Sequence, residues 1–287
     1  MSLLSTSELI KKYGLNAKKS LGQNFILDKN FTDKIARAAG DLTDFTVLEI
    51  GPGLGSLTRS ILDAGVKKLI AVEKDQRCLQ ALEELRDFYG SRLQIIEGDA
   101  LKIDEMKIFQ TPQQVRGDKS QIEDGKLKFK IIANLPYNIG TLLLFKWLKI
   151  APQISSMHLM LQKEVAQRIV AKTGENHYGR LAVMVNFLCQ TKIVFNVSPS
   201  VFTPPPKVTS AIIEIIPRAK PLVDVEFAKL EKVVAVAFNQ RRKMLKSSLK
   251  SIFPNAEEVL KDSAINPELR AENLTIEEFC KLAQRLK

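Results

Sequence analysis

The sequence predicts an α/β fold built on a mostly parallel β-sheet, followed by a small helical domain. Three observations lead to this prediction. Short apolar runs alternate with amphipathic segments through the first half of the chain, which is typical of βαβ units and a parallel sheet. The runs are apolar at nearly every position, as expected of strands covered on both faces. After Pro217, helical periodicity continues without a strand pattern.

Five strands are predicted to form the parallel part of the sheet, and two predicted helices connect some of them. The strands are VLEI (47–50), KLIAVE (68–73), LQIIEG (93–98), FKIIANL (129–135) and MHLMLQ (157–162), and the helices cover 56–64 and 76–90. Two later apolar runs, 192–197 and 211–216, have no helical segment between them. Their linker contains three consecutive prolines, which are incompatible with a helix interior. We therefore expect an antiparallel hairpin at the edge of the sheet.

Chain length and the change of pattern at Pro217 predict two domains. At roughly 150 residues per domain, 287 residues correspond to one large domain and one smaller one. We place the α/β domain at residues 1–217 and the helical domain at residues 218–287. The stretch 110–126 is polar and interrupted by Gly and Pro, which predicts a surface insertion.

Composition excludes several classes of protein. With 45% hydrophobic and 26% charged residues, the chain has the composition of a globular protein. No apolar stretch approaches the roughly 18 residues of a membrane span, and the N-terminus lacks a secretory pattern. We therefore expect a cytoplasmic protein that binds no membrane. The three cysteines form no CxxC pair and there are only two histidines, so no metal site is predicted.

The net charge of +11 and the pI of about 9.5 predict a polyanionic partner. Five basic residues fall within ten positions without an acid among them: Arg241, Arg242, Lys243, Lys246 and Lys250. On a helix, residues four apart share a face, so Arg242, Lys246 and Lys250 are expected to form one stripe. A solvated helix face is the alternative interpretation.

The segment VLEIGPGLGSLT predicts a ligand-binding loop between the first strand of the sheet and the next helix. Gly51 and Gly53 allow a tight turn and a close approach of the backbone to a ligand. Such a loop lies at the carboxyl edge of the sheet, where ligands bind in doubly wound folds. Pro52 lacks the amide that a pyrophosphate needs. The loop therefore favours a nucleoside cofactor without phosphates, with a purely structural turn as the alternative.

Acidic residues at the ends of the next two strands support a nucleoside site. Glu73 follows Gly51 by 22 residues, close to the roughly 20-residue offset at which an acid binds a ribose diol. Asp99 comes directly after the third strand, at the same predicted edge, where it can accept a hydrogen bond from an adenine amine. Taken singly, either acid could simply be solvated.

The fourth strand leads into Asn134-Leu135-Pro136-Tyr137, which resembles the catalytic motif of class I S-adenosylmethionine-dependent adenine methyltransferases. Further motifs occur in the order found in the KsgA family of bacterial small-subunit rRNA adenine dimethyltransferases. These motifs are KKSLGQNFILD (18–28), EIGPGLGSLT (49–58), GDALK (98–102), NLPYNIGT (134–141), MLQKEVAQRI (160–169), YGRL (178–181), VFTPPPKVTSA (201–211) and FNQRRKMLKSSL (238–249).

This resemblance implies roles for individual residues. The catalytic residues would be Asn134, Leu135, Pro136 and Tyr137, and the residues binding the cofactor would be Asn24, Ile26, Gly51, Gly53, Glu73, Asp99 and Asn134. Tyr137 and Phe202 would hold the target adenine, and the basic residues of 241–250 would bind RNA. Alternatives remain at three positions: Phe202 could anchor the proline-rich loop, and Asn24 and Ile26 could form only a turn before a helix.

The resemblance implies dimethylation of two adjacent adenines near the 3′ end of small-subunit rRNA during ribosome biogenesis. S-adenosylmethionine would be the methyl donor and S-adenosylhomocysteine the product, without a metal. The implied partner is the immature 30S particle, bound by a monomer. Three alternatives remain: an Erm-type methyltransferase of large-subunit rRNA, a DNA adenine methyltransferase, and an assembly factor whose methylation is dispensable or lost.

Overall fold

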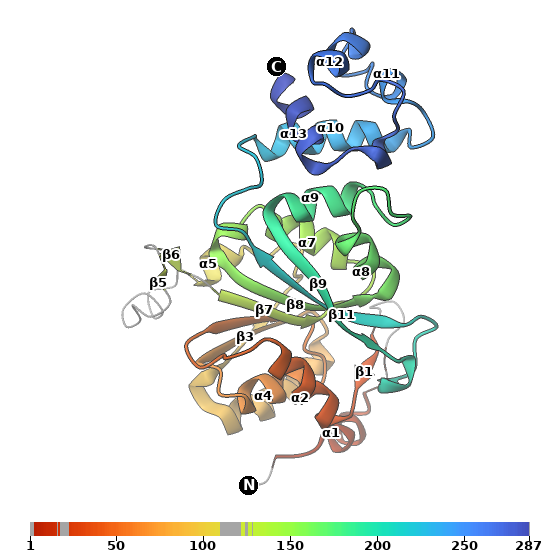
Figure 1. Cartoon of the computed structure of the whole chain (residues 1–287). Helices are drawn as coiled ribbons and strands as arrows, with labels where there is room; N and C mark the ends of the chain where they lie inside the picture. The colour runs from red at the N-terminus through yellow and green to blue at the C-terminus, as the bar shows by residue number, and fades with distance from the viewer. Residues whose placement is uncertain are drawn as a thin grey trace. The chain divides into compact units, whose positions relative to one another are not determined.

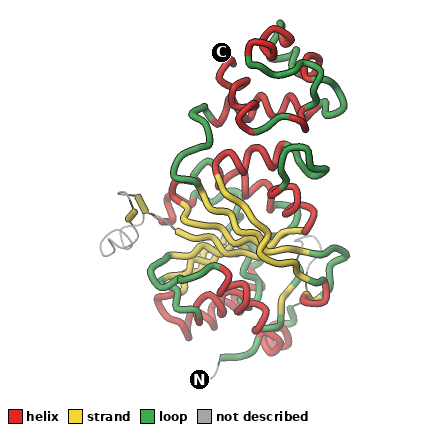
Figure 2. The backbone as a smooth tube through the Cα atoms, viewed as in Figure 1, coloured by secondary structure: helices red, strands yellow, loops and turns green. Residues whose placement is uncertain are grey.

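The computed structural model describes residues 3–15, 17, 23–109, 122–123, 126–127 and 129–286. The chain divides into two compact units (Figures 1 and 2). The first unit comprises Met1–Lys163 and Lys192–Pro217, and the second comprises Glu164–Thr191 and Arg218–Lys287. This division coincides with the sequence-based one at Pro217 but differs over 164–191, which the sequence division assigns to the first domain.

The first unit is built on a seven-stranded sheet of order β4-β3-β2-β7-β8-β11-β9. The strands are β2 (Thr46–Ile50), β3 (Lys68–Glu73), β4 (Leu93–Glu97), β7 (Phe129–Asn134), β8 (Ile154–Gln162), β9 (Cys189–Val197) and β11 (Ser210–Pro217). Strands β4, β3, β2, β7 and β8 pair in parallel, and β11 runs antiparallel to β8. The mostly parallel α/β fold is therefore confirmed, and β9 and β11 are neighbours at one edge as predicted.

Helices cover both faces of this sheet (Figure 1). They are α1 (Thr6–Tyr13), α2 (Lys29–Ala38), α3 (Ser56–Asp63), α4 (Gln76–Tyr89), α5 (Glu105–Phe109) and α7 (Gly140–Leu148). Helices α2 and α4 lie on one face, and α5 and α7 lie on the other. Every residue of β2 is buried, as expected of a central strand covered on both faces.

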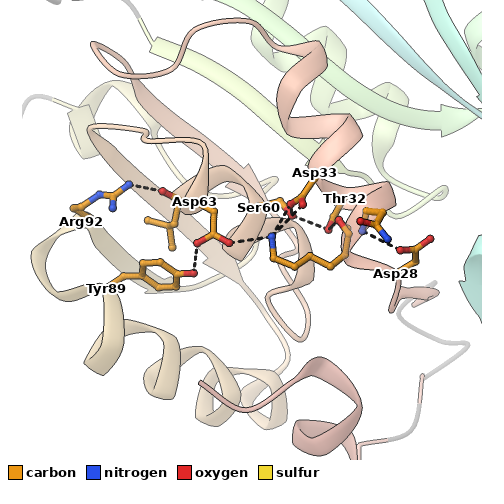
Figure 3. A network of polar contacts seen from close by, with 10 residues as sticks. Asp28, Thr32, Asp33, Ser60, Asp63, Tyr89 and Arg92 are labelled. Atoms are coloured by element: carbon orange, nitrogen blue, oxygen red, sulfur yellow. Dashed lines mark hydrogen bonds and ion pairs between the residues drawn. The ribbon is translucent and has the colours of Figure 1, made fainter. Parts of the chain in front are cut away.

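A polar network joins α2, α3 and α4 on their face of the sheet (Figure 3). Ser60 donates a hydrogen bond to Asp33 at 2.6 Å, and Lys29 forms ion pairs with Asp33 and Asp63. The hydroxyl of Tyr89 donates to Asp63 at 2.7 Å. These contacts fix the helix that begins directly after the glycine-rich loop, and so help to hold that loop in place.

A second, two-stranded sheet was not predicted. Strand β1 (Phe25–Ile26) pairs antiparallel with β10 (Phe202–Thr203), with Ile26 opposite Phe202. The strands have only two residues each, too few to give a recognisable pattern in the sequence. This pairing brings the segment around Asn24 to the proline-rich loop.

The second unit is helical. Its helices are α8 (Lys163–Val170), α9 (Arg180–Leu188), α10 (Phe227–Asn239), α11 (Leu245–Ser248), α12 (Ala256–Asp262) and α13 (Ile276–Arg285). Among the described residues, 3-10 turns occur at Ala271–Asn273 in this unit and at Gly90–Arg92, Ala151–Gln153 and Pro199–Val201 in the first unit. Helix α10 packs against α9 and α13, and the ring of Phe238 lies 5.6 Å from that of Phe279.

The expectation that Arg242, Lys246 and Lys250 form one helical stripe is wrong. Helix α11 contains only Leu245–Ser248, because Met244 has an extended backbone conformation. The amides of Leu245 and Lys246 donate to the carbonyls of Leu269 and Pro267 instead of to a preceding helical turn. Arg242 therefore precedes the helix and Lys250 follows it.

Most of the predicted insertion 110–126 lies outside the described residues. The exceptions are β5 (Ile122–Glu123) and the first residue of β6 (Lys126–Leu127), and these two strands pair with each other antiparallel. Within the described part of the chain, no helix is long and apolar enough to span a membrane.

Candidate active site

A pocket of about 310 Å³ lies in the first unit, at the carboxyl ends of β2, β3, β4 and β7. Its volume is at the lower end of the range of roughly 300–1,000 Å³ that is usual for small-molecule sites. The lining residues come from 23–26, 49–54, 56–57, 72–74, 98–101 and 134–139. Every residue predicted to bind the cofactor, and all four residues of the NLPY turn, line this one pocket.

The glycine-rich loop reaches the pocket in a conformation that other residues rarely adopt. Gly53 has φ +57°, and a Cβ atom there would lie 3.3 Å from the ring of Phe25. Gly55 has φ +76°, and a Cβ there would collide with the side chain of Leu85. Glycine is thus required both by the backbone angle and by the packing. The loop is shaped so that its backbone borders the pocket directly.

Glu73 is buried, and backbone amides hold its carboxylate in place. Its Oε2 accepts a hydrogen bond from the amide of Gly53 at 2.9 Å, and its Oε1 accepts from Lys74 and Asp75 at 2.8 and 2.7 Å. Burial raises the pKa of Glu73, while these three hydrogen bonds act in the opposite direction. A carboxylate offers about four acceptor sites. One site therefore remains for a hydroxyl in the pocket.

Asp99 lies at the end of β4 next to Lys74 of the neighbouring strand end. Its Oδ2 pairs with Lys74 Nζ at 2.9 Å, and its Oδ1 accepts from the amide of Leu101 at 3.0 Å. The hydrogen bond from Lys74 is the main cause of the lowered pKa of Asp99. The side chain is therefore an ionised acceptor at neutral pH, at the edge of the pocket where it was predicted.

The NLPY turn begins at the last residue of β7 and leads directly into α7. The Asn134 side-chain amide nitrogen lies 3.5 Å from the carbonyl of Asn24, to which it donates. The carbonyl of Pro136 accepts from the amides of Ile139 and Gly140, both at 3.1 Å. No described residue donates a hydrogen bond to Asn134 Oδ1 or to the Leu135 carbonyl in this structure. Two acceptors on successive residues thus remain available beside the pocket.

Tyr137 and Phe202 have different surroundings. Tyr137 lines the pocket, is partly exposed, and its hydroxyl lies 2.7 Å from Ser210 Oγ. Phe202 is 3% exposed and packs in the hydrophobic core together with Ile26 and Met160. Phe202 is not among the residues that line the pocket. Its packing agrees with the alternative role of anchoring the proline-rich loop, and its contact with a target adenine stays a prediction.

Sequence reasoning missed Glu49, a second buried acid at the pocket. Glu49 is 1% exposed, lines the pocket, and accepts a hydrogen bond from Thr58 Oγ1 at 2.7 Å. Burial raises the pKa of Glu49 to about 8, and the nearby charge of Glu73 adds to the shift. A charged residue type inside the otherwise apolar strand VLEI was the available signal, because an acid is rarely buried without a reason.

The predicted RNA-binding residues lie in the second unit. Arg241 is paired with Glu272 at 2.8 Å, and Lys246 with Glu268 at 3.3 Å. The other three, Arg242, Lys243 and Lys250, are exposed and have no ion pair with any described residue. Among the described residues there is also no group of three His, Cys, Asp or Glu side chains suited to a metal ion.

Comparison with known proteins identifies relatives along the whole chain. Residues 14–287 match the family model described as ribosomal RNA adenine dimethylase. A protein of Allorhizobium ampelinum named ribosomal RNA small subunit methyltransferase A is 50% identical over 97% of this chain and 96% of its own length. One from Ruegeria sp. with the same name is 47% identical over 98% of this chain and 95% of its own.

Two solved structures are similar in fold. A dimethyladenosine transferase from Plasmodium falciparum is 29% identical, with a TM-score of 0.73, over 90% of this chain and 95% of its own. The 23S rRNA methyltransferase ErmE is 26% identical, with a TM-score of 0.66, over 92% of this chain and 99% of its own. The family match confirms the resemblance drawn from the motifs. The chain belongs to the ribosomal RNA adenine dimethylase family of S-adenosylmethionine-dependent methyltransferases.

Proposed function

We propose that this protein dimethylates the exocyclic amines of two adjacent adenines near the 3′ end of small-subunit rRNA. The observation that carries the proposal is the meeting of two predicted sites in one pocket. Glu73 and Asp99, the acids expected to hold a nucleoside, share that pocket with the NLPY turn, which is expected to hold the target amine. Relatives that are about 50% identical along nearly the whole chain are named small-subunit methyltransferases, which supports this choice of RNA.

The residues present fit S-adenosylmethionine. Glu73 keeps one acceptor site for a ribose hydroxyl, and Asp99 is an ionised acceptor for an adenine amine. Asn24 and Ile26 also line the pocket. When bound, the cofactor supplies an electrophilic methyl group on a sulfonium.

The NLPY turn can prepare the adenine amine as a nucleophile. The lone pair of this amine is delocalised into the ring, so the free amine is a weak nucleophile. Asn134 Oδ1 and the Leu135 carbonyl would each accept a hydrogen bond from one N–H of the amine, which favours a pyramidal nitrogen and directs its lone pair. Pro136 stiffens the turn. Acceptors fixed in advance lower the barrier without reorganisation during the reaction.

Tyr137 would hold the extruded adenine. Its side chain borders the pocket and its hydroxyl is hydrogen-bonded to Ser210, so the outer end of the ring is anchored before the base arrives. Stacking of a base on an aromatic ring contributes about 1–3 kcal/mol. Phe202 would act on the other side of the base only if it left its present place in the core.

We further infer that the substrate is an immature 30S particle, met in the cytoplasm by a monomer of this protein. Arg242, Lys243 and Lys250 are exposed cations that can contact phosphates. The excess of basic residues in the first 40 residues suggests that the first unit also contributes to RNA binding.

The proposal is tested by substrate choice. Purified protein would be incubated with methyl-labelled S-adenosylmethionine and either immature 30S particles or large-subunit RNA, with Asn134→Ala as the control for background label. We expect up to four methyl groups per 30S particle, all on two adjacent adenines. Label confined to large-subunit RNA would mean an Erm-type activity. Tight 30S binding without label would indicate an assembly factor.

A further inference from the structure

Lys146 of α7 binds the loop that carries Asp99. Its Nζ lies 2.8 Å from the carbonyl of Ala100, 2.5 Å from the carbonyl of Ile103 and 2.9 Å from Glu105 Oε1. An ammonium group has three hydrogens, so these three acceptors can use all of them. Ala100 itself lines the pocket.

The loop from Asp99 to Ile103 is a single hydrogen-bonded turn. The amides of Lys102 and Ile103 donate to the carbonyl of Asp99 at 2.8 and 3.1 Å, and the amide of Leu101 donates to its side chain. Lys146 holds this turn at two of its carbonyls. The position of the Asp99 carboxylate therefore depends on where α7 holds Lys146.

Helix α7 is also a direct continuation of the NLPY turn. The amide of Gly140 donates to the Pro136 carbonyl, and that of Leu143 to the Ile139 carbonyl at 2.9 Å. Gly140 is tightly packed, because a Cβ there would lie 2.9 Å from Leu161. Lys146, less than two turns further along the helix, thus connects the NLPY turn to the Asp99 loop through one rigid element.

The carboxylate that pairs with Lys146 is itself held firmly. Glu105 is 3% exposed, and its Oε1 also accepts a hydrogen bond from Trp147 Nε1 at 2.8 Å. Trp147 is fully buried on the same helix as Lys146. The ammonium therefore has a fixed counter-charge, which limits its movement.

We propose that Lys146 is a positioning residue for cofactor binding, which sets the place of Asp99 relative to the NLPY turn. This inference rests on the proposed binding of the cofactor's adenine by Asp99. Lys146 itself would contact neither the cofactor nor the target adenine. A merely structural lysine would stabilise the fold without influencing what Asp99 contributes to binding.

Lys130 offers a matched control within the same unit. Its Nζ donates to the carbonyls of Ala39 and Asp41 at 2.9 and 2.7 Å, so it too ties a regular element to a loop. Neither Ala39 nor Asp41 lines the pocket. Replacing either lysine by methionine keeps most of the apolar stem and removes the ammonium.

The experiment is a double-mutant cycle on binding of S-adenosylhomocysteine, measured by calorimetry on the full chain. We expect Lys146→Met to raise the Kd about tenfold in the presence of Asp99, and less than twofold in an Asp99→Ala background. Lys130→Met should lower Tm and leave the Kd unchanged. Equal effects of Lys146→Met in both backgrounds, or a lower Tm with an unchanged Kd, would overturn the proposal.

The Asp99→Ala variant of the cycle and one further double variant separate the possible outcomes. If Asp99→Ala alone binds as tightly as wild type, the assignment of Asp99 fails, and with it the role given to Lys146. Should Lys146→Met not fold because Glu105 is left buried without its partner, the pair Lys146→Met with Glu105→Gln removes that charge. The same tenfold loss, dependent on Asp99, is expected there, and its absence counts against the proposal.

Discussion

The hydroxyl of Tyr137 lies 2.7 Å from Oγ of Ser210, so the aromatic ring of the NLPY turn is tied to the first residue of β11. Ser210 is fully buried and pairs across the sheet with Gln162 of β8. Tyr137 is only partly buried. The hydrogen bond therefore anchors an accessible aromatic side chain to a buried part of the sheet, which is the arrangement that a stacking platform needs.

Separate changes to Tyr137 should distinguish its ring from its hydroxyl. Tyr137→Phe keeps the ring and loses a hydrogen bond of about 1 kcal/mol, so kcat/KM should fall less than tenfold. Tyr137→Ala removes the stacking surface, and a loss of about 1–3 kcal/mol corresponds to roughly 5- to 150-fold in kcat/KM. Methyl transfer to 30S particles is the measurement. Equal losses in both variants would contradict a stacking role for the ring.

Replacement of Asn134 should affect turnover far more than cofactor affinity. We expect Asn134→Ala to lower kcat by about 10²–10³-fold, because one of two fixed acceptors is lost. The Kd for S-adenosylhomocysteine should stay within tenfold of wild type. Asn134→Asp keeps an acceptor while losing the bond to Asn24, and should retain more activity than the alanine variant. Wild-type turnover in Asn134→Ala would exclude Asn134 from the chemistry.

The buried carboxyl of Glu49 should make stability depend on pH. Because its pKa is raised to about 8 in the folded protein, the folded state binds an extra proton between the unfolded pKa and pH 8. The contribution of Glu49 to the free energy of unfolding therefore declines as pH rises from about 4.5 to 8. The glutamine of Glu49→Gln cannot titrate. The difference between the Tm of this variant and the Tm of the wild type should therefore be several degrees more positive at pH 8.5 than at pH 5. Thermal unfolding at both pH values provides the measurement, and a constant difference would contradict the raised pKa.

Exposed cations of the second unit should determine part of the salt dependence of RNA binding. Arg242, Lys243 and Lys250 have no ion pair with any described residue, so their charge is available to phosphates. Replacing all three by Gln should reduce the slope of log K against log salt by about 2. Lys281→Gln, at an exposed position of α13, is the control and should leave the slope nearly unchanged. An unchanged slope in the triple variant would mean that these residues form only a solvated surface.

Local sequence patterns were sufficient to predict most of the fold and most of the residues proposed for the chemistry. The strand KLIAVE was predicted with its observed ends, Lys68 and Glu73, because continuous apolar runs report burial on both faces. Asp99 and the NLPY turn were placed correctly at one sheet edge, since parallel strands bring their carboxyl ends together. By contrast, β8 begins at Ile154, three residues earlier than predicted, because Ile154 pairs with Phe129 of another strand.

The α/β class, the glycine-rich loop and the family motifs could be predicted without a structure, because each depends on neighbouring residues. Which of these segments touch is known only from the folded chain. Asn134 meets Asn24 across 110 positions of sequence, and Lys146 meets Ala100 across 46. Likewise, the amides of Leu245 and Lys246 donate to carbonyls of distant residues, so the helix expected there begins only at Leu245. Partners so distant in sequence leave no periodic pattern, because the sheet and its packed helices, rather than local propensity, bring them together.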